Sequence, residues 1–402
     1  MNDDELREYV HARPNAELTG ILTFGGEAPA RPRRRLAAAL RLRPARSRRA
    51  DDEAGSGDAE GLARLARLVT AEIARRPHDP SSASVARTLG DGLSTLGRFE
   101  DAAAAYHEAR ALALQSGRQL EAARCTVARA NALAGLGRFE QALAGYEEAQ
   151  SVLSGSDQES DVALCTMNRA VALANLGRFH EAVADFEKAA EVFARCDSDL
   201  AAARCRVNRA NALASQGRCH EALACYDEAR PVLANAGQTI EAARCTMNRA
   251  VALRNLGRFQ EALAGCEEAR LVFAELGQEP EAARCTMNRA HALAGLGRHA
   301  DAAARFEEAR AVYDRCGQEV DAARCTLGRA NALRSMGRFD EALVGYDEAH
   351  TAYTRLGFEL EAARCTLNGA MALSSLGRFD EAAADSDKAR AVYARHSQKA
   401  WS

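Results

Sequence analysis

The sequence predicts an all-α protein, an α-α superhelix of about eight helix-turn-helix repeats preceded by a disordered N-terminal head. The first observation is a cassette, Gly-Arg-Phe-Glu-Glu-Ala-Leu-Ala-x-Tyr-x-Glu-Ala, that recurs every 40 residues. A fixed period of this length is typical of stacked supersecondary units. The second is composition, because 47% of the residues are hydrophobic but only 5% are aromatic, which suits closely packed helices. The cassette glycines are Gly97, Gly137, Gly177, Gly217, Gly257, Gly297, Gly337 and Gly377.

The first 57 residues lie outside the repeat and carry segregated charge. Nine arginines and no acidic residue fall within residues 31–49, and an acidic stretch follows at residues 51–58. Blocks of like charge usually stay solvated, so we expect residues 1–57 to be a disordered basic head and acidic linker. The head is either a tail without a specific role or a basic arm that contacts an acidic partner, nucleic acid or lipid headgroups.

Residues 58–80 are expected to form a helix that caps the stack. Leu62, Leu65 and Val69 share one face of this helix with Ile73. Prolines at positions 77 and 80 end it. The repeat array is then expected over residues 81–397.

Each repeat is expected to hold two helices, helix A and helix B. In the repeat from Asp161 to Asp197, helix A is predicted from Asp161 to Leu176 and helix B from Phe179 to Cys196. Gly177 follows helix A, and glycine readily adopts the left-handed conformation that ends a helix. The turn after helix B carries glycine at Gly117, Gly237, Gly277, Gly317 and Gly357, with Asp157 and Asp197 in its place in two repeats.

Seven of the twelve cysteines occupy one position of the repeat. Helices pack about 8–10 Å apart, whereas a disulfide needs Cα atoms within about 7 Å, so neighbouring copies cannot be cross-linked. The sequence has no CxxC motif, so the cysteine spacing does not indicate a zinc site. We therefore expect small, buried, apolar residues in a reducing environment, and neither a metal nor a cofactor. The column comprises Cys125, Cys165, Cys205, Cys245, Cys285, Cys325 and Cys365.

Small and aromatic residues of helix B resemble the tetratricopeptide repeat over residues 82–396. The family's usual period is about 34 residues, and the 40-residue form is similar to the long-helix repeats of kinesin light chains, Pins-type spindle adaptors and bacterial regulators. The resemblance implies a right-handed superhelix with helix A lining its concave face. The residues that carry it are alanines at 102, 142, 182, 222, 262, 302, 342 and 382, alanines at 109, 149, 189, 229, 269, 309, 349 and 389, and Tyr106, Tyr146, Phe186, Tyr226, Phe306 and Tyr346 between them.

A polar stripe runs along helix A at spacings of four and three residues, which places it on one side of the helix. The resemblance places that side in the groove. Asparagine side chains both donate and accept hydrogen bonds, so they can hold the backbone of an extended peptide, while arginines bind carboxylates. Alternatively, the asparagines bridge neighbouring A helices and only fix the superhelical pitch. The stripe comprises Asn131, Asn168, Asn208, Asn211, Asn248, Asn288, His291, Asn331 and Asn368, with Arg124, Arg204, Arg244, Arg284, Arg324 and Arg364.

A second arginine column lies on the apolar side of helix A, where a charge must be paired. We expect a structural ladder of ion pairs with acids of helix B, the alternative being contact with a ligand. Gly369 replaces the arginine in the last repeat, which we attribute to the absence of a following repeat. The arginines are Arg129, Arg169, Arg209, Arg249, Arg289 and Arg329, and the candidate acids are Glu148, Glu187, Asp227, Glu267, Glu307 and Asp347.

The sequence favours a binding function over catalysis. It contains no Gly-x-x-x-x-Gly-Lys-Ser/Thr, His-Glu-x-x-His or Gly-x-Ser-x-Gly motif. No apolar run approaches the roughly 20 residues of a membrane span. The acidic N-terminus is unlike a secretion signal, so we expect a cytoplasmic protein. The alanine- and arginine-rich composition favours a bacterial source.

We expect a non-enzymatic scaffold or adaptor that binds an extended peptide or protein segment, with acidic residues among its possible contacts. The net charge of −3 argues against nucleic acid except through residues 31–49. The alternative is a peptide-sensing regulator. In that case the superhelix changes pitch on ligand binding, and the arginine-rich head contacts an effector or nucleic acid.

Overall fold

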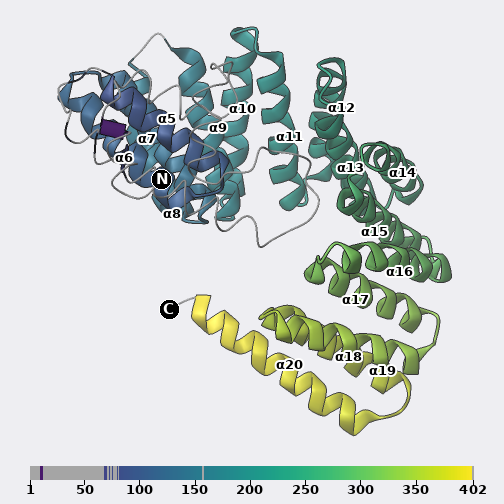
Figure 1. Cartoon of the computed structure of the whole chain (residues 1–402). Coiled ribbons are helices and arrows are strands. Elements are labelled where there is room, and N and C mark those ends of the chain that lie inside the picture. Colours follow the sequence, from purple (N-terminus) through teal and green to yellow (C-terminus); the bar gives the residue numbers. More distant parts are fainter. Residues whose placement is uncertain are drawn as a thin grey trace. The chain divides into compact units, whose positions relative to one another are not determined.

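The computed structural model describes residues 10–11, 68–69, 72, 75, 79, 81–155 and 158–400. The predicted disordered head lies outside the described residues except at positions 10–11, and so does Asp157. From residue 81 on, the described chain forms sixteen helices and no strand (Figure 1). The helices are α5 Ser82–Thr95, α6 Phe99–Gln115, α7 Gln119–Gly135, α8 Phe139–Leu153, α9 Glu159–Asn175, α10 Phe179–Arg195, α11 Asp199–Ser215, α12 Cys219–Asn235, α13 Thr239–Asn255, α14 Phe259–Glu275, α15 Glu279–Gly295, α16 His299–Arg315, α17 Glu319–Ser335, α18 Phe339–Arg355, α19 Glu359–Ser375 and α20 Phe379–Ala400.

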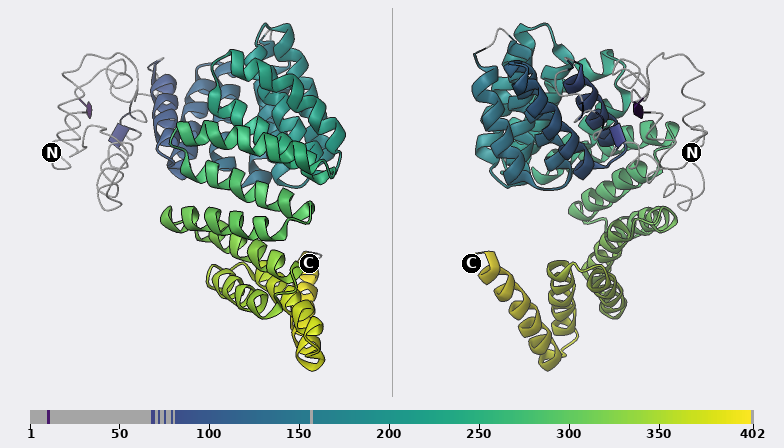
Figure 2. Two further views of the ribbon diagram at one scale, coloured as in Figure 1. Left: turned by 90° about the vertical axis from the view of Figure 1, so that its right-hand side faces the viewer. Right: turned by 60° about the vertical axis from the view of Figure 1, so that its left-hand side comes forward.

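The chain divides into two compact units, Met1–Asn208 and Arg209–Ser402, and the boundary falls inside α11. Helices α5 to α10 pack each against the next in the first unit, and helices α12 to α20 do so in the second (Figure 2). The A helices also contact one another, as α7 does with α9 and α13 does with α15. Each unit is therefore a stack of helical hairpins, with its A helices side by side in one layer.

Left-handed residues close the turns, as the sequence predicts. Gly177 has φ 75° after α9, and the Arg178 amide donates to the Leu173 carbonyl at 2.9 Å, which closes the helix end. After α10 the same conformation falls on Asp197, with φ 54°, and the Ser198 amide donates to the Phe193 carbonyl at 2.8 Å. The chain thus reverses twice in each 40-residue repeat with little intervening loop.

The core between helices is built from small side chains packed around one large ring. In the hairpin of α9 and α10, Phe186 is buried against Ala170, Leu173 and Ala182. All seven cysteines of the repeated column are fully buried and free, as predicted. Burial raises the pKa of these thiols, to about 11 at Cys165 and to about 12 at Cys245. They are therefore protonated apolar residues at neutral pH.

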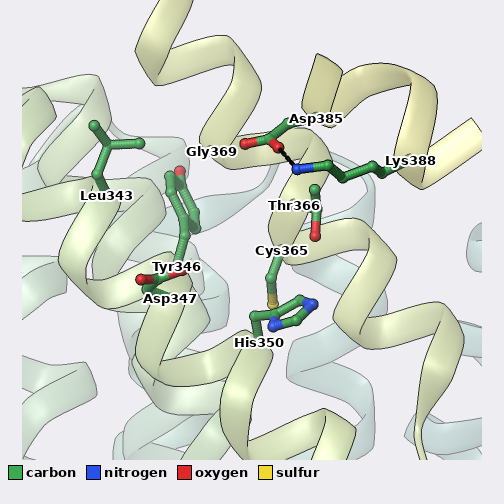
Figure 3. Close-up of a pocket in the computed structure, with 9 residues that line it drawn as sticks. All are labelled: Leu343, Tyr346, Asp347, His350, Cys365, Thr366, Gly369, Asp385 and Lys388. Atoms are coloured by element: carbon green, nitrogen blue, oxygen red, sulfur yellow. Dashed lines mark hydrogen bonds and ion pairs between the residues drawn. The ribbon is translucent and has the colours of Figure 1, made fainter. Parts of the chain in front are cut away.

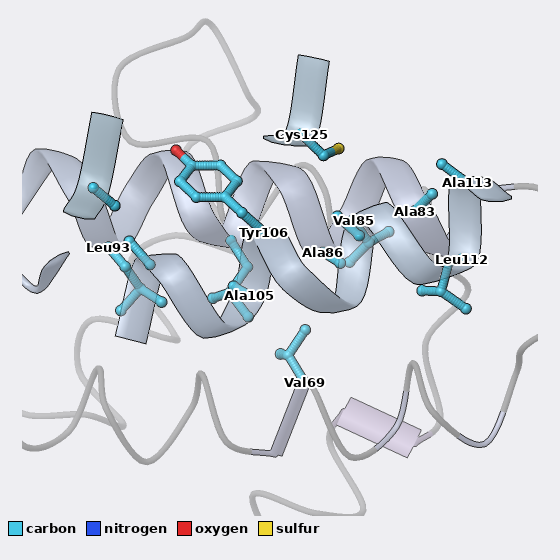
Figure 4. Packing of buried hydrophobic residues seen from close by; sticks show 14 of the residues in the cluster. Val69, Ala83, Val85, Ala86, Leu93, Ala105, Tyr106, Leu112, Ala113 and Cys125 are labelled. Carbon is cyan, nitrogen blue, oxygen red and sulfur yellow. The ribbon is translucent and has the colours of Figure 1, made fainter. Parts of the chain in front are cut away.

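Part of the predicted capping helix lies within the described residues. Positions 68, 69 and 72 are helical, and the other residues from 58 to 80 are outside the described part apart from positions 75 and 79. Val69 is 1% exposed and packs in a cluster with Val85 and Ala86 of α5 (Figure 4). Val69 lies on the face that the sequence predicted to be apolar.

Candidate functional site

A hollow of about 410 Å³ lies in the first unit, on the side formed by the A helices. Three successive A helices, α5, α7 and α9, contribute to it because they lie side by side. It includes two residues of the predicted polar stripe, Arg124 and Asn131. The lining residues are Arg87, Asp91, Ser94, Tyr106, Arg124, Val127, Ala128, Asn131, Leu153, Asp161 and Leu164.

Three of the four charged side chains of this hollow are hydrogen-bonded to other residues that line it. Arg124 of α7 donates through Nε to Asp161 of α9 at 2.7 Å. The Tyr106 hydroxyl donates to Asp91 at 2.7 Å. Burial, and then the hydrogen bond to Asp91, raise the pKa of Tyr106, so the phenol remains protonated. Two arginines and two aspartates line the hollow, which gives it no net charge.

Helix α9 offers an exposed face that combines apolar groups with an amide. Leu164 is 43% exposed and Val171 is 37% exposed, and the half-buried Asn168 lies between them in sequence. Spacings of four and three residues place the three on one side of the helix. Leu164 lines the hollow and occupies the position at which six other repeats carry arginine. This face differs from its repeated equivalents in being apolar.

The asparagines at one position of the stripe bind tyrosine hydroxyls of their own hairpin. Asn131 Oδ1 accepts from Tyr146 at 2.6 Å, and Asn211 Oδ1 accepts from Tyr226 at 2.6 Å. The same contact joins Asn331 and Tyr346 at 2.8 Å. These amides satisfy hydroxyls that enter the helix interface, so their oxygens are already used in holding the hairpin together.

A covariation between repeats could have revealed this role from the sequence. Repeats with tyrosine in helix B carry an acceptor fifteen residues earlier, either asparagine or aspartate. Repeats without that tyrosine carry valine, histidine or methionine there. The pairs with the tyrosine are Asp91/Tyr106, Asn131/Tyr146, Asn211/Tyr226 and Asn331/Tyr346, and those without it are Val171/Phe186, Val251/Cys266, His291/Phe306 and Met371/Ser386.

The second asparagine position has two kinds of environment. Asn248 donates to Asn211 of the preceding repeat at 3.0 Å, and Asn368 donates to Asn331 at 3.1 Å. Asn208 and Asn288 follow repeats that carry valine instead of an acceptor. Together with Asn168 they make no side-chain hydrogen bond within the described residues. Some amides therefore bridge neighbouring A helices, while others remain available on the surface of the layer.

His291 packs in the helix interface. Its ring lies against Phe306 at a centroid distance of 4.9 Å, edge to face. Burial, and then the positive charges of Arg254 and Arg324, lower the pKa of His291 to about 4. The imidazole is therefore neutral near pH 7.

The arginines of the stripe contact the chain's own side chains at several positions. Arg244 pairs with Glu281 of the next A helix at 3.3 Å, as Arg124 does with Asp161. Arg324 pairs with Asp321 one turn earlier at 2.6 Å, and Arg284 lies against the Met247 sulfur at 3.4 Å. Arg204 and Arg364 are exposed.

Four arginines of the second column form ion pairs with acids of helix B, as the predicted ladder requires. Three of the expected acids pair with it: Arg249 with Asp227 at 2.6 Å, Arg289 with Glu267 at 2.6 Å and Arg329 with Glu307 at 3.5 Å. Arg169 instead binds the buried Asp185 of α10, with Nε and Nη2 each 2.8 Å from a carboxylate oxygen. Its third nitrogen donates to Gln150 of α8 at 2.8 Å. Asp185 was not among the candidate acids, and it pairs with the Arg169 guanidinium at 2.7 Å.

Our explanation of Gly369 was also wrong. In the three pairs Arg249–Asp227, Arg289–Glu267 and Arg329–Glu307 the acid lies in the preceding repeat, not in the following one. The corresponding acid before Gly369 is Asp347, and it is present.

Two general features bear on the kind of site that is possible. Within the part of the chain that the structure describes, no three histidine, cysteine, aspartate or glutamate side chains gather in a way that could hold a metal ion. None of the described helices combines the length and apolar character that spanning a membrane requires.

Family models for the tetratricopeptide repeat match most of the helical array. One model matches residues 162–235 and 241–315, a second matches residues 287–355, and a third matches residues 362–398. A model of the soluble NSF attachment protein, SNAP, matches residues 81–191. Among curated protein sequences no match is found.

Solved structures of similar fold have little sequence in common with this chain. The sensor protein PH0952 of Pyrococcus horikoshii, a signal transduction ATPase with a tetratricopeptide repeat sensor, superposes with a TM-score of 0.59 at 12% identity, over 97% of this chain and 64% of that one. The apo form of RapI gives 0.57 at 14% identity, over 68% and 99%. Rap protein complexed with competence and sporulation factor gives 0.56 at 12% identity, over 96% and 99%.

These matches agree with the 40-residue helical hairpins, the alanine-lined crossings and the layer of A helices. The chain therefore belongs to the tetratricopeptide repeat family.

Proposed function

We propose that this protein is a non-enzymatic interaction scaffold, and that the hollow at α5, α7 and α9 binds an extended peptide or a protein segment of a partner. The observation that carries the proposal is the exposed face of α9. Leu164 and Val171 expose apolar surface beside the hollow, and Asn168 lies between them with its amide free within the described residues.

Such a face suits a peptide in extended conformation. The amide of Asn168 can donate to a peptide carbonyl and accept from a peptide N–H. The flanking Leu164 and Val171 can cover apolar side chains, and each side chain removed from water contributes about 1.5–3 kcal/mol when fully buried. Recognition would thus combine sequence-tolerant backbone contacts with a preference for apolar residues.

The electrostatics of the hollow argue for binding rather than catalysis. Asp91 accepts a hydrogen bond from Tyr106, and Asp161 accepts one from Arg124, so neither carboxylate is free to act as a general base. The arginines of the polar stripe were expected to bind carboxylates of a partner. Three of them, Arg124, Arg244 and Arg324, pair instead with acids of the chain itself. We therefore propose no preference for acidic peptides at this hollow.

The peptide-sensing alternative adds to this proposal that the superhelix changes pitch when the peptide binds. Rap protein with competence and sporulation factor, and the Rap conjugation regulator of plasmid pLS20 with the Phr* peptide, are complexes on this fold, with TM-scores of 0.56 and 0.50. At 12% and 13% identity the likeness is one of fold alone. The arginine-rich segment that would contact an effector lies outside the described residues.

The test uses peptides selected on the full-length protein from a displayed random library. Their affinity is then measured by fluorescence polarisation against wild type and against the double variant Leu164→Arg/Asn168→Ala. Leu164→Arg restores the residue that most repeats carry, and both positions are accessible, so the fold should be preserved. We expect binding to weaken about tenfold or more, because tenfold corresponds to about 1.4 kcal/mol.

Asn235→Ala is the matched control, because Asn235 is exposed at the end of a B helix, outside the hollow. It should leave the affinity unchanged. Selected peptides that bind the double variant as tightly as wild type, at an unchanged melting temperature, would refute the hollow as the binding site.

A further inference from the structure

Around α19 of the last hairpin, the neighbouring helices α18 and α20 retain the acids of the arginine ladder, but α19 lacks the arginine. Asp347 occupies the position that Asp227, Glu267 and Glu307 hold in earlier repeats, each of which pairs with a ladder arginine. Asp385 occupies the position of Asp185, which binds Arg169. The ladder position itself is Gly369. Two carboxylates thus lie where this chain elsewhere places acids around a guanidinium.

A cavity of about 250 Å³ lies at this place, between α18, α19 and α20 (Figure 3). Gly369, Asp347 and Asp385 all line it, together with Tyr346, His350 and Lys388. A Cβ built at Gly369 would meet no atom closer than 3.9 Å, so the helix has room for a side chain here. The cavity would hold several water molecules at about 30 Å³ each.

The two carboxylates are only partly neutralised. Asp347 is exposed and has no ion pair among the described residues. Asp385 pairs with Lys388 one turn later at 2.8 Å, but the lysine side chain is 72% exposed. Exposed pairs of this kind contribute little and exchange readily, so a second cation can share the Asp385 carboxylate.

We propose that this cavity binds the guanidinium group of an arginine side chain from a partner polypeptide. The argument is charge complementarity read from the chain's own repeats, in which the same two positions hold arginine. At Arg169, two guanidinium nitrogens contact two carboxylate oxygens of Asp185 at 2.8 Å. A planar fork makes such paired contacts, whereas a lysine ammonium is a single point of charge. The proposal concerns the second unit and does not depend on the hollow at α5, α7 and α9.

The experiment titrates the full-length protein with N-acetyl-L-arginine methylamide at low ionic strength, followed by NMR. The citrulline analogue has the same shape without the charge, and the lysine analogue has the charge without the fork. We expect saturable binding of the arginine probe. Both analogues should bind at least about tenfold more weakly. Free L-arginine, whose carboxylate is repelled by the aspartates, should also bind more weakly than the capped probe.

Gly369→Arg should restore the ladder, abolish probe binding and raise the melting temperature above that of Gly369→Ala. Gly369→Ala is the matched control, because it supplies the same gain in helix propensity but leaves the carboxylates accessible, so it should still bind the probe. Asp347→Asn should weaken binding about tenfold without altering the circular dichroism spectrum.

Three results would overturn the assignment. They are no saturable binding of the capped arginine at millimolar concentration, equal binding of the citrulline analogue, or undiminished binding to Gly369→Arg. If free L-arginine binds more tightly than the capped probe, the ligand is a small molecule and not an arginine side chain of a polypeptide.

Discussion

At the residue scale, the polar stripe of helix A contains two functions that look alike in the sequence. Asn131 and Asn211 hold tyrosine hydroxyls, whereas Asn168 and Asn208 have no hydrogen-bond partner in the described part of the chain. The two pairs occupy different positions of helix A, and only the first position lies fifteen residues before a tyrosine of helix B. Repeated asparagines are therefore not a uniform ladder.

The pair Asn131 and Tyr146 provides a direct test of this division. Asn131→Val leaves the Tyr146 hydroxyl without its partner and should cost about 1–3 kcal/mol of unfolding free energy. Adding Tyr146→Phe recreates the natural combination Val171/Phe186 and should recover most of the loss. Urea unfolding of wild type, both single variants and the double variant gives the coupling energy. A coupling near zero would mean that the hydrogen bond adds nothing.

His291 should make stability depend on pH. The pKa of His291 falls from its ordinary value of about 6.5 to about 4 in the folded protein. Between these values the unfolded chain binds the proton and the folded protein does not, so stability falls as pH falls through this window. The loss should be at most about 3 kcal/mol, and it should not grow below pH 4.

The measurement is chemical unfolding at several pH values between 7 and 4 for wild type and His291→Val, which recreates the Val171/Phe186 pair. The variant should lose less stability on acidification. Parallel pH profiles for the two proteins would contradict the depressed pKa.

At the element scale, the hairpins could be predicted from the sequence almost completely. The cassette gives the helix ends because Gly177 and its equivalents adopt positive φ, and α10 begins at the predicted residue, Phe179. The arginine ladder could be predicted because a charge on an apolar face needs a partner. The partner Asp185 could not be, because it replaces the small residue found at that position in most repeats. Only the packed structure shows that an acid there faces Arg169.

The turns predict opposite effects of two substitutions. Asp197→Gly should stabilise the protein by up to about 1 kcal/mol, because glycine adopts positive φ without the steric cost that other residues bear. Gly177→Ala should destabilise it by about 1–2 kcal/mol. Thermal melts of the two variants beside wild type provide the comparison. Destabilisation by Asp197→Gly would show that the aspartate makes a contribution beyond its backbone conformation.

At the scale of the whole molecule, the chain is a series of local contacts. Within each unit, the described helices pack mainly against their neighbours in sequence, so stability is close to a sum over repeats and interfaces. The period and the cysteine spacing predict this architecture from the sequence. The division into the units Met1–Asn208 and Arg209–Ser402 could not be predicted, because the cassette continues across it without change.

Thiol labelling tests the architecture along the whole chain. After denaturation all twelve cysteines should react without prior reduction. In the native protein Cys316 is exposed and should react fast, whereas the seven column cysteines are fully buried with raised pKa and should react only when their hairpin opens. Mass spectrometry of labelled peptides resolves each position. Fast native labelling of the column would contradict the packing.

The hydroxyl pairs also bear on how a chain of near-identical repeats avoids assembling with itself incorrectly. If helix A of one hairpin associated with helix B of an adjacent one, Val171 would face Tyr146 or Tyr226, and a buried hydroxyl would lose its acceptor. At these three hairpins, an exchange with a neighbour therefore leaves a tyrosine hydroxyl without its acceptor. Such differences between neighbouring repeats therefore destabilise slipped or exchanged hairpins, both during synthesis and between crowded copies of the chain.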